Sequence, residues 1–570
     1  MKRDFYLKEL KMSGFKCINI YCENTNIEKS YPFGTTLHDI ILDQKIEMEN
    51  PILGAMVNNS LKELDYLLYK PKTVRFIDYT HPDGKRMYLR SLSMVLFKAA
   101  VDLYPKERLK IEHAVSNGLY CELGKMINTE SHLEIVNNLR KRMQEIIDQD
   151  IPFKRDEIRT ELALKIFEDF SLHDKCTLMR TRQQFYSSVY KLDNVVNYFY
   201  GYLLPSSGYL KHFDLVKYYE GMLLVAPKAE EPQKIPEIIV QTKLFEIFRE
   251  FKEWVDIIGV PNVGQLNLAT QNGKISDIIK ISEALQEKKL ACIADMINKK
   301  REEIKVVFIS GPSSSGKTTF AKRLSIQLSV LGFKPVVLSM DNYFVDRAHT
   351  PKDKNGDYDF ESPKAIDIKL FNENMLDLLD GKEISIPKFS FSTGQRSYNG
   401  SKLALDKNSI VLVEGIHGLN PIVSEMIPEN RKFKVYVSAL SPLSIDSSNR
   451  ISTTDNRLIR RMVRDHSYRG YSALETMQRW QSVRAGEELH IFPYQEEADV
   501  MFNTALLFEL GVLKKWIEPI LKEVPPIVPE YSEARRLIKF LSYILPIPEK
   551  EIPPTSILRE FLDGSSFDYS

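Results

Sequence analysis

The C-terminal half of this 570-residue chain is predicted to fold as an α/β domain with a parallel five-stranded sheet. Five apolar runs, each the length of a buried strand, alternate with helical patterns. They lie at 304–309, 335–339, 409–413, 433–437 and 498–502. Strands that alternate with helices are typical of a parallel sheet with helices on both faces. Such sheets bind ligands at the carboxyl ends of their strands, so we expect functional residues directly after these runs.

A glycine-rich loop, Gly311-Pro-Ser-Ser-Ser-Gly316-Lys317-Thr318, follows the first run and leads into a helical pattern closed by Gly332. Its glycines let backbone N–H groups turn toward phosphate, and the helix N-terminus adds a positive dipole. Lys317 is expected to reach the β- and γ-phosphates, and the Thr318 hydroxyl to hold Mg²⁺. A plain Gly/Ser-rich turn is the weaker alternative, because it requires neither the strand nor the helix. The predicted nucleotide-binding residues are Gly311, Ser313, Ser314, Ser315, Gly316, Lys317, Thr318 and Thr319.

Two acidic residues follow or end other strands of the predicted sheet. Asp341 comes after the second run, where a carboxylate can accept a proton from an attacking hydroxyl group. The alternative for Asp341 is a turn residue that caps the next segment. Glu414 ends the third run and suits an acid that orients Mg²⁺, because a buried carboxylate without a cation would be costly. His417 stands alone nearby, and we expect a structural role for it.

Four arginines, Arg457, Arg460, Arg461 and Arg464, are spaced to share one face of a helix. Such a stripe is often only a solvated surface. In a chain with a phosphate loop, it is better explained as a helical lid that folds arginines over the transferring phosphoryl group. Arg464 and Arg469 are the strongest candidates for this contact. The predicted catalytic residues are Asp341, Lys317, Arg464 and Arg469, and the predicted metal ligands are Thr318 and Glu414.

Together with segments 358–367 and 386–396, these motifs resemble the uridine kinase and phosphoribulokinase family over residues 304–504. The resemblance implies a P-loop kinase fold, ATP with Mg²⁺ as phosphoryl donor, and Asp341 as the base toward a nucleoside 5′-hydroxyl. It also implies an acceptor pocket formed by Phe344, Phe360, Glu361, Phe389, Phe391 and Arg396.

Three positions in this pocket region depart from the family pattern. Uridine-cytidine kinases typically have Asp at the position of Glu361, Tyr at that of Phe389 and His at that of Gly394. The resemblance implies that these groups help to hold a pyrimidine nucleoside. Sites that pair polar groups of a substrate discriminate strongly, whereas apolar walls do not. We therefore expect kinase chemistry with an altered base preference.

Composition bears on partners and compartment. The 78 basic and 77 acidic residues give a net charge of +1, which does not favour nucleic acid or an anionic membrane as the main partner. Five scattered cysteines without a Cys-x-x-Cys pair suggest reduced thiols. A charged N-terminal stretch and the lack of a long apolar run predict a cytoplasmic protein without a membrane span.

Short motifs at 31–36, 90–94, 116–121, 151–155 and 204–208 give the N-terminal half a resemblance to threonyl-tRNA synthetase. The first is similar to its ubiquitin-like TGS domain and the others to its editing domain, both of α+β type. The histidines and cysteine of the editing site correspond here to Arg90, Met94, Phe199 and Leu203, so hydrolytic editing is not expected. RNA binding, small-ligand binding and a role in an oligomer are the alternatives for this half.

The chain is predicted to comprise five segments, with a Pro-rich break at 226–236 between its halves. Apolar residues at helical spacing predict a long helix over 131–150, and the polar end at 563–570 is expected to be frayed. The five segments are a TGS-like domain (1–75), an editing-like domain (76–226), a helical linker (227–300), the kinase domain (301–505) and a helical C-terminal extension (506–570).

Three functions fit these observations. The first is transfer of the γ-phosphoryl group of ATP to the 5′-hydroxyl of a nucleoside. The second is a kinase for another small hydroxyl acceptor, such as a sugar phosphate, for which Arg396 could bind the anion. The third is an ATP-dependent RNA-binding or regulatory protein, which would require a basic surface on residues 1–225. The absence of an Asn-Lys-x-Asp motif argues against a GTPase.

Overall fold

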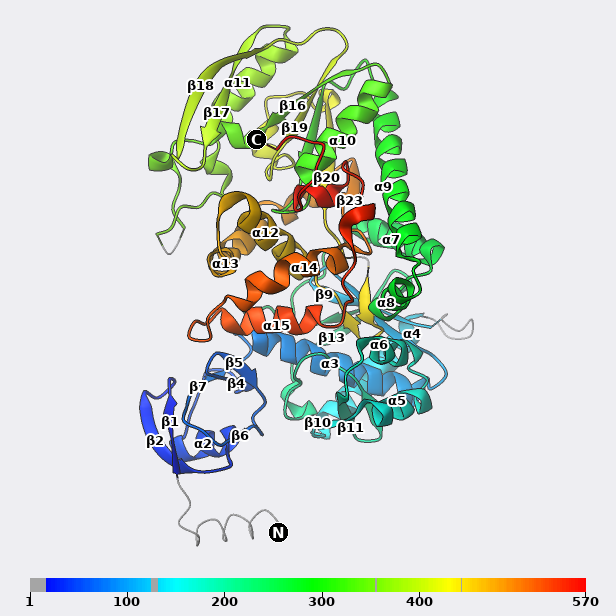
Figure 1. The fold of residues 1–570 in the computed structure, drawn as a ribbon, viewed down its shortest axis with the longest axis vertical. Helices are drawn as coiled ribbons and strands as arrows, with labels where there is room; N and C mark the ends of the chain where they lie inside the picture. Colours follow the sequence, from blue (N-terminus) through cyan, green and yellow to red (C-terminus); the bar gives the residue numbers. More distant parts are fainter. Residues whose placement is uncertain (1–16, 125–131, 354–355, 442, 570) are drawn as a thin grey trace.

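The computed structural model describes residues 17–124, 132–353, 356–441 and 443–569 (Figure 1). A small sheet with the strand order β2-β1-β7-β4-β5 lies at one end of the molecule. Thr36 caps helix α2 and forms a reciprocal capping box with Asp39, which fixes the start of the helix. The elements are β1 (Cys17–Cys22), β2 (Ile27–Pro32), β3 (Thr35–Thr36), α2 (Leu37–Gln44), β4 (Gly54–Val57), β5 (Ser60–Lys62), β6 (Leu67–Leu68) and β7 (Lys72–Ile77).

A second α+β region combines the antiparallel sheet β13-β14-β9-β8, the three strands β10-β11-β12 and helices α3 to α6. Helix α4 confirms the helix predicted over 131–150, and it buries Ile135, Leu139 and Met143. Leu133, in contrast, is exposed. The elements are α3 (Pro82–Leu103), β8 (Leu109–Val115), β9 (Gly118–Leu123), α4 (His132–Asp148), β10 (Lys154–Arg159), α5 (Thr160–Asp169), α6 (His173–Arg182), β11 (Tyr186–Leu192), β12 (Val195–Asn197), β13 (Asp214–Tyr218) and β14 (Gly221–Val225).

Three helices, α7 (Thr242–Ile258), α8 (Val263–Gln271) and α9 (Ile275–Asn298), follow the Pro-rich break, as the helical pattern of this segment predicted. Leu266 of α8 packs into the core of the second region, whereas Ile293 of α9 packs against the parallel sheet. These helices therefore join two hydrophobic cores. The five domain boundaries stay predictions.

All five predicted strands of the C-terminal half form one parallel sheet in the order β16-β19-β15-β20-β23. The predicted α/β architecture is thus confirmed for this part of the chain. The strands are β15 (Val306–Ser310), β16 (Lys334–Ser339), β19 (Ser409–Glu414), β20 (Lys432–Ser438) and β23 (Val500–Asn503).

Helices cover both faces of this sheet. Alternate residues of β15 point to opposite sides: Val307 and Ile309 pack with α9 and α10, and Val306 and Phe308 pack with α11. Burial on both faces explains why the strand sequences are apolar throughout instead of alternating with polar residues. Helix α10 spans Lys317–Val330 and helix α11 spans Ile368–Leu379.

A β-hairpin and helices α12 to α15 complete the C-terminal half. Helix α12 was predicted as the arginine helix, and α14 and α15 agree with the predicted helical extension, whereas the hairpin and α13 were not predicted. Helices α12 to α15 share a hydrophobic core with the second region, so the halves are packed together (Figure 1). No helix among the described residues is long and apolar enough to cross a membrane, and all five cysteines are free. The elements are β17 (Ile384–Ser390), β18 (Gln395–Leu403), β21 (Ser444–Asp446), β22 (Asn449–Arg450), α12 (Thr453–Arg469), α13 (Ala473–His490), α14 (Glu509–Lys522) and α15 (Tyr531–Leu541).

A buried ion pair links the two halves. Lys175 of α6 donates a hydrogen bond of 2.6 Å to Asp446 of β21, and both side chains are 0% exposed. Asp446 also accepts backbone hydrogen bonds from Ser448 and Asn449. The carboxylate therefore fixes the turn between β21 and β22 while it holds the lysine of the other half.

We predict that Lys175→Ala will lower the free energy of unfolding by about 3–5 kcal/mol, because it leaves the Asp446 carboxylate buried without its cation. Denaturant titration followed by tryptophan fluorescence measures this change. Lys334→Ala is a matched control: its pair with Asp406 is 68% and 49% exposed, and such pairs contribute at most about 1 kcal/mol. Equal losses in the two variants would contradict the prediction.

Candidate active site

The predicted phosphate loop starts at the carboxyl end of β15 and leads into α10. Its glycines are required by geometry: a Cβ on Gly311 would lie 1.9 Å from the Val437 carbonyl oxygen, and Gly316 has a φ of +83°. The hydroxyl groups of Ser314 and Ser315 are buried without a hydrogen-bond partner in the described structure. Buried polar groups are normally paired, so these hydroxyls indicate that the loop binds a polar ligand.

The strand order brings the predicted acidic residues to this loop. Strand β19 lies between β15 and β16, so the carboxyl ends of the three strands are neighbours. Glu414 at the end of β19 accepts a hydrogen bond of 3.0 Å from Ser339 Oγ, and its Oε2 lies 3.5 Å from Thr318 Oγ1. The backbone N–H of Asp341 donates to the same Ser339 hydroxyl at 3.3 Å.

Lys317 and these carboxylates share one electrostatic environment. Burial lowers the pKa of Lys317 and raises the pKa of Asp341, because both charged forms lose hydration. The charges of Lys317, Arg469 and Arg464 act on Asp341 in the opposite direction and favour its ionised form. Burial also raises the pKa of Glu414 to about 7, and the neighbouring Asp341 charge adds to this effect. A cation would stabilise this pair of acids.

The donor atoms fit Mg²⁺, which prefers oxygen ligands. The Thr318 hydroxyl and the Glu414 carboxylate are the protein groups that would hold it. Within the described ranges, no group of three or more His, Cys, Asp or Glu side chains could hold a metal ion. In nucleotide sites Mg²⁺ is commonly held by one or two protein groups together with phosphate oxygens and water.

Helix α12 does not present the single arginine stripe that its spacing predicted. Arg457 and Arg460 are 1% and 0% exposed and form ion pairs with Glu487 and Glu509. Arg457 Nε also donates a hydrogen bond of 2.9 Å to the Ser313 carbonyl oxygen of the phosphate loop, so it supports the loop from a buried position. The expectation that Arg457 and Arg460 form an open face over the phosphate is wrong, because both guanidinium groups are buried in ion pairs. Their partners lie on α13 and α14, and buried guanidinium groups require such acidic partners. Helical spacing alone cannot show where these acids lie.

The other arginines of α12 are less completely buried than Arg457 and Arg460. Arg461 Nη1 donates a hydrogen bond of 2.9 Å to Ser313 Oγ in the phosphate loop. Arg464 and Arg469 both lie within ion-pair distance of Asp465, and their charges also act on Asp341. The Arg469 side chain is 48% exposed, which leaves it free to approach a bound phosphate. The catalytic roles of Arg464 and Arg469 stay predictions.

The four phenylalanines of the predicted acceptor pocket form one cluster. The ring of Phe344 lies 5.6 Å from that of Phe389, 5.5 Å from that of Phe391 and 6.2 Å from that of Phe360, centroid to centroid. Phe389 is buried, whereas Phe391 is 50% exposed. The open face of Phe391 offers a surface on which a planar base can stack.

Glu361, a predicted acceptor-pocket residue, lies in the same electrostatic environment as Lys317 and Asp341. Burial raises the pKa of Glu361 to about 7; the Glu487 charge adds to this shift, and Arg461 and Lys317 oppose it. Its Oε2 atom is buried and has no hydrogen-bond partner in the described structure. The Glu361 carboxyl group can accept a hydrogen bond when it is ionised and donate one when it is protonated, so it can pair with a polar group of a ligand.

The structure explains why residue 394 is glycine in this chain. Gly394 has a φ of +71°, and a Cβ there would lie 2.7 Å from Arg347 Nε. Arg347 donates a hydrogen bond of 2.6 Å to the Phe391 carbonyl oxygen, so its guanidinium occupies the space beside the aromatic cluster. A histidine, which the family pattern has at this position, would collide with this arginine. Sequence reasoning did not identify Arg347, because no motif contains it.

Arg396, the last predicted pocket residue, is already paired. Its Nη1 donates a hydrogen bond of 2.9 Å to Asp367 Oδ2, and its backbone N–H donates to Asp346. The carboxylate neutralises the guanidinium, so Arg396 offers less charge to an anionic acceptor than its sequence position suggested.

The segment 563–570 was predicted to be frayed, but its described part, up to Tyr569, is anchored at the start of α10. The hydroxyl groups of Tyr569 and Thr319 lie 2.9 Å apart, and Glu560 accepts two hydrogen bonds from Thr319. The polar composition of the segment was a misleading signal, because Tyr569 pairs with Thr319 in the first turn of α10 and Ser566 pairs with the Pro554 carbonyl oxygen.

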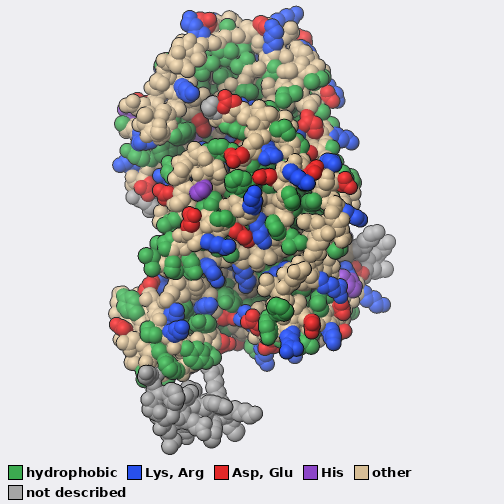
Figure 2. Space-filling model, viewed as in Figure 1, with side chains coloured by type: hydrophobic (Ala, Val, Ile, Leu, Met, Phe, Trp, Pro, Cys, Tyr) green, Lys and Arg blue, Asp and Glu red, His purple; other side chains and the backbone are tan. Residues whose placement is uncertain are grey.

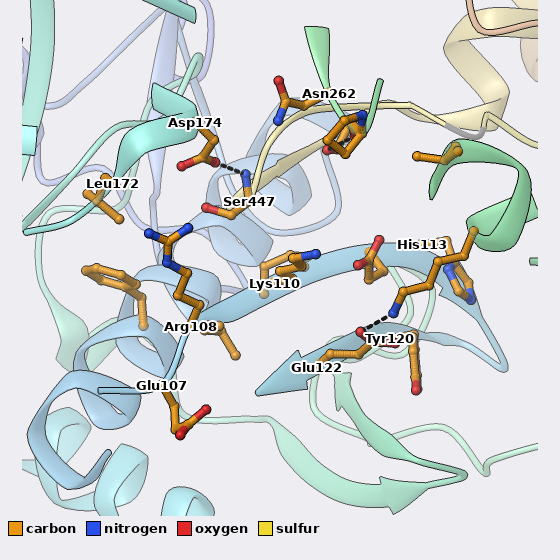
Figure 3. Close-up of a pocket in the computed structure, with 18 of the residues that line it drawn as sticks. Glu107, Arg108, Lys110, His113, Tyr120, Glu122, Leu172, Asp174, Asn262 and Ser447 are labelled. Atoms are coloured by element: carbon orange, nitrogen blue, oxygen red, sulfur yellow. Dashed lines mark hydrogen bonds and ion pairs between the residues drawn. The ribbon is translucent and has the colours of Figure 1, made fainter. Parts of the chain in front are cut away.

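A cavity of about 960 Å³ lies between the two halves and is separate from the predicted site (Figure 3). Its wall includes Lys110, Glu112 and His113 of β8, residues of α7, and the segment around Ser447. Burial lowers the pKa of His113 to about 3, and its neutral ring stacks on Phe248 with centroids 3.5 Å apart. The wall carries both signs of charge and no residue of the phosphate loop. Tyr120 of the motif at 116–121 lines it, but the motif by itself did not indicate a cavity.

The four positions that correspond to the editing site of the synthetase lie side by side on α3 and the segment after β12. The backbone N–H of Leu204 donates a hydrogen bond of 2.8 Å to Ser91 Oγ, which joins the two segments. Met94, Phe199 and Leu203 are buried. Their apolar side chains supply no group for proton transfer or metal binding.

Lys and Arg side chains are mixed with Asp and Glu on the face shown in Figure 2.

We predict that Glu361→Gln will raise the melting temperature more at about pH 8 than at about pH 5. Burial raises the pKa of Glu361 in the folded state to about 7. Below the unfolded-state pKa of about 4.3 the group is protonated in both states and does not lower the free energy of unfolding. As the pH rises from there to about 7, ionisation increasingly favours the unfolded state. Glutamine does not titrate and avoids this cost. Calorimetry at the two pH values tests the effect, with the exposed Glu425→Gln as the control. A pH-independent difference would contradict it.

Comparisons with known proteins agree with this geometry. The model of the Phosphoribulokinase / Uridine kinase family matches residues 306–506. A uridine kinase of Staphylococcus epidermidis is 27% identical over 197 residues, which cover 34% of this chain and 86% of the relative. A uridine kinase of Staphylococcus aureus is 28% identical over 200 residues, with the same two coverages.

One of the matching solved structures is described as a possible uridine kinase from Bacillus stearothermophilus. It has 18% identity and a TM-score of 0.25 over 38% of this chain and 98% of that chain. The family match coincides with the parallel sheet, the phosphate loop and the segments that carry Asp341, Glu414 and α12. Residues 306–506 therefore form a domain of the phosphoribulokinase/uridine kinase family within a longer chain.

Proposed function

We propose that this protein is an ATP-dependent nucleoside kinase, which transfers the γ-phosphoryl group to the 5′-hydroxyl of a nucleoside. The observation that carries the proposal is the meeting of the phosphate loop, Asp341 and Glu414 at one edge of the parallel sheet. The family match and the names of the uridine kinase relatives support the same reaction class.

The proposed reaction assigns a role to each charged group. Asp341 accepts the proton of the acceptor hydroxyl as this oxygen attacks the γ-phosphorus. Lys317, Arg464 and Arg469 stabilise the negative charge on the transferring group, and Mg²⁺ bound with the nucleotide neutralises the phosphates. The positive charges near Asp341 favour its ionised form, which is the form a base requires.

The pocket favours an uncharged acceptor over a sugar phosphate. The Arg396 guanidinium is neutralised by Asp367, and the remaining predicted pocket side chains are four phenylalanines and Glu361. Aromatic rings suit a nucleobase, and a glutamate would repel a phosphorylated acceptor. With phenylalanine at 389 and glycine at 394, base discrimination by the family's usual polar groups is not expected.

We predict ATP-dependent phosphorylation of at least one nucleoside in a panel of purine and pyrimidine nucleosides and phosphorylated sugars. Asp341→Asn should lower kcat by about 10²–10⁴-fold, because the general base is lost. The control is Asp380→Asn, an exposed carboxylate outside the site. Phosphorylation of sugar phosphates alone would overturn the proposed acceptor. Full activity of Asp341→Asn would overturn the proposed base.

We predict that Phe391→Ala will raise KM for the nucleoside about ten-fold and change kcat less, because the half-exposed ring binds the base and does not take part in phosphoryl transfer. Steady-state kinetics with nucleoside as the varied substrate measures the split. Phe185→Ala, which removes an 87% exposed ring in the N-terminal half, is the control. An unchanged KM would place the acceptor elsewhere.

A further inference from the structure

The C-terminal strap, which we define as residues 556–569, ends on the phosphate loop. Thr319 donates two hydrogen bonds to Glu560 Oε2, one from its backbone N–H at 3.2 Å and one from its hydroxyl at 2.8 Å. The Tyr569 hydroxyl lies 2.9 Å from Thr319 Oγ1. The N–H of Thr319 belongs to the first turn of α10, where backbone donors have no acceptor within the helix. A carboxylate thus occupies a donor that the sequence assigns to nucleotide phosphate.

Contacts on both sides hold the strap in this position. Ile557 is buried in the core that includes α10, and its Cγ2 would lie 2.7 Å from a Cβ on Gly316. On the other side, Tyr468 of α12 donates a hydrogen bond of 2.8 Å to the Leu562 carbonyl oxygen. The Arg460 guanidinium lies 5.0 Å from the centroid of the Phe561 ring. The strap therefore bridges the phosphate loop and the arginine helix.

The Glu560 carboxylate and a nucleotide phosphate require the same position. Glu560 is 8% exposed, so little solvent screens its charge. Helix N-termini bind anions, and one anion is already present at Thr319. A phosphate at the same donors would meet a buried negative charge, and like charges repel strongly where the dielectric is low. The hydroxyls of Ser314 and Ser315, by contrast, have no partner in the described structure, so the strap blocks only the helix end of the loop.

We infer that the strap is autoinhibitory: Glu560 holds the phosphate position at Thr319, and a nucleoside triphosphate binds fully only after Glu560 leaves it. The inference rests on the proposed function, because it takes the loop as the nucleotide site. The apparent affinity for nucleotide is then reduced by the fraction of molecules in which the strap is closed. Displacement of residues 556–569 becomes the step that controls this affinity.

The test is calorimetric titration of the full chain with ADP and with a non-hydrolysable ATP analogue, each with Mg²⁺. Glu560→Gln removes the charge but keeps the shape of the side chain, and it should tighten binding about ten-fold. Tyr569→Phe, which removes one contact with Thr319, should tighten binding less. Glu425→Gln, an exposed glutamate in the same half, is the charge control and should bind like the wild type.

Unchanged or weaker binding by Glu560→Gln would overturn the inference and show that Glu560 is a structural cap, while the proposed function would stand. No nucleotide binding by any of the proteins would overturn both. Hydrogen–deuterium exchange on the wild-type chain tests the inference without a variant. Backbone amides in 556–569 should exchange faster when the ATP analogue is bound. Unchanged or slower exchange would contradict release of the strap.

Discussion

The strand order β16-β19-β15-β20-β23 is the constraint on which the rest of the candidate site depends. Parallel strands end at the same edge of a sheet, and β19 lies between the two strands that lead to the phosphate loop and to Asp341. This order brings Thr318, Glu414 and Asp341 together although they are distant in sequence. A different order with the same strands would keep every motif and separate the groups that the chemistry requires.

Burial gives these groups their electrostatic properties. Burial lowers the pKa of Lys317 and raises the pKa of Asp341, because the charged form of each group loses hydration. The positive charges of Lys317, Arg469 and Arg464 oppose the shift of Asp341. Glu414 and Glu361 have pKa values raised to about 7. The site therefore contains acids that a bound cation or a polar ligand would stabilise, which is a property of a binding site more than of a structural core.

The N-terminal half is part of the same packed structure. Helices α12 to α15 share a core with the second α+β region, and the Lys175–Asp446 pair joins the halves without exposure to solvent. Helix α12 contacts the phosphate loop through Arg461 and the strap through Tyr468. A change in the packing of the N-terminal half can therefore reach the phosphate loop through α12.

The sequence by itself determined the features that depend on local order along the chain. The five strands, the phosphate loop with its two required glycines, the helix that follows, and the carboxylates at strand ends all follow from apolar runs and from residues next to them. The aromatic cluster of Phe344, Phe360, Phe389 and Phe391 was indicated by the family resemblance, and the structure brings these rings together.

Only the tertiary structure decided which charges meet. Helical spacing placed Arg457 and Arg460 on one face with Arg464. In the structure Arg457 and Arg460 are buried and form ion pairs with Glu487 and Glu509. In the same way Arg347 fills the space beside Gly394, Asp367 neutralises Arg396, and Glu560 occupies the donors of Thr319. The physical reason is that a polar side chain is stabilised by whichever partner the fold brings to it, and that partner can come from any distance along the chain.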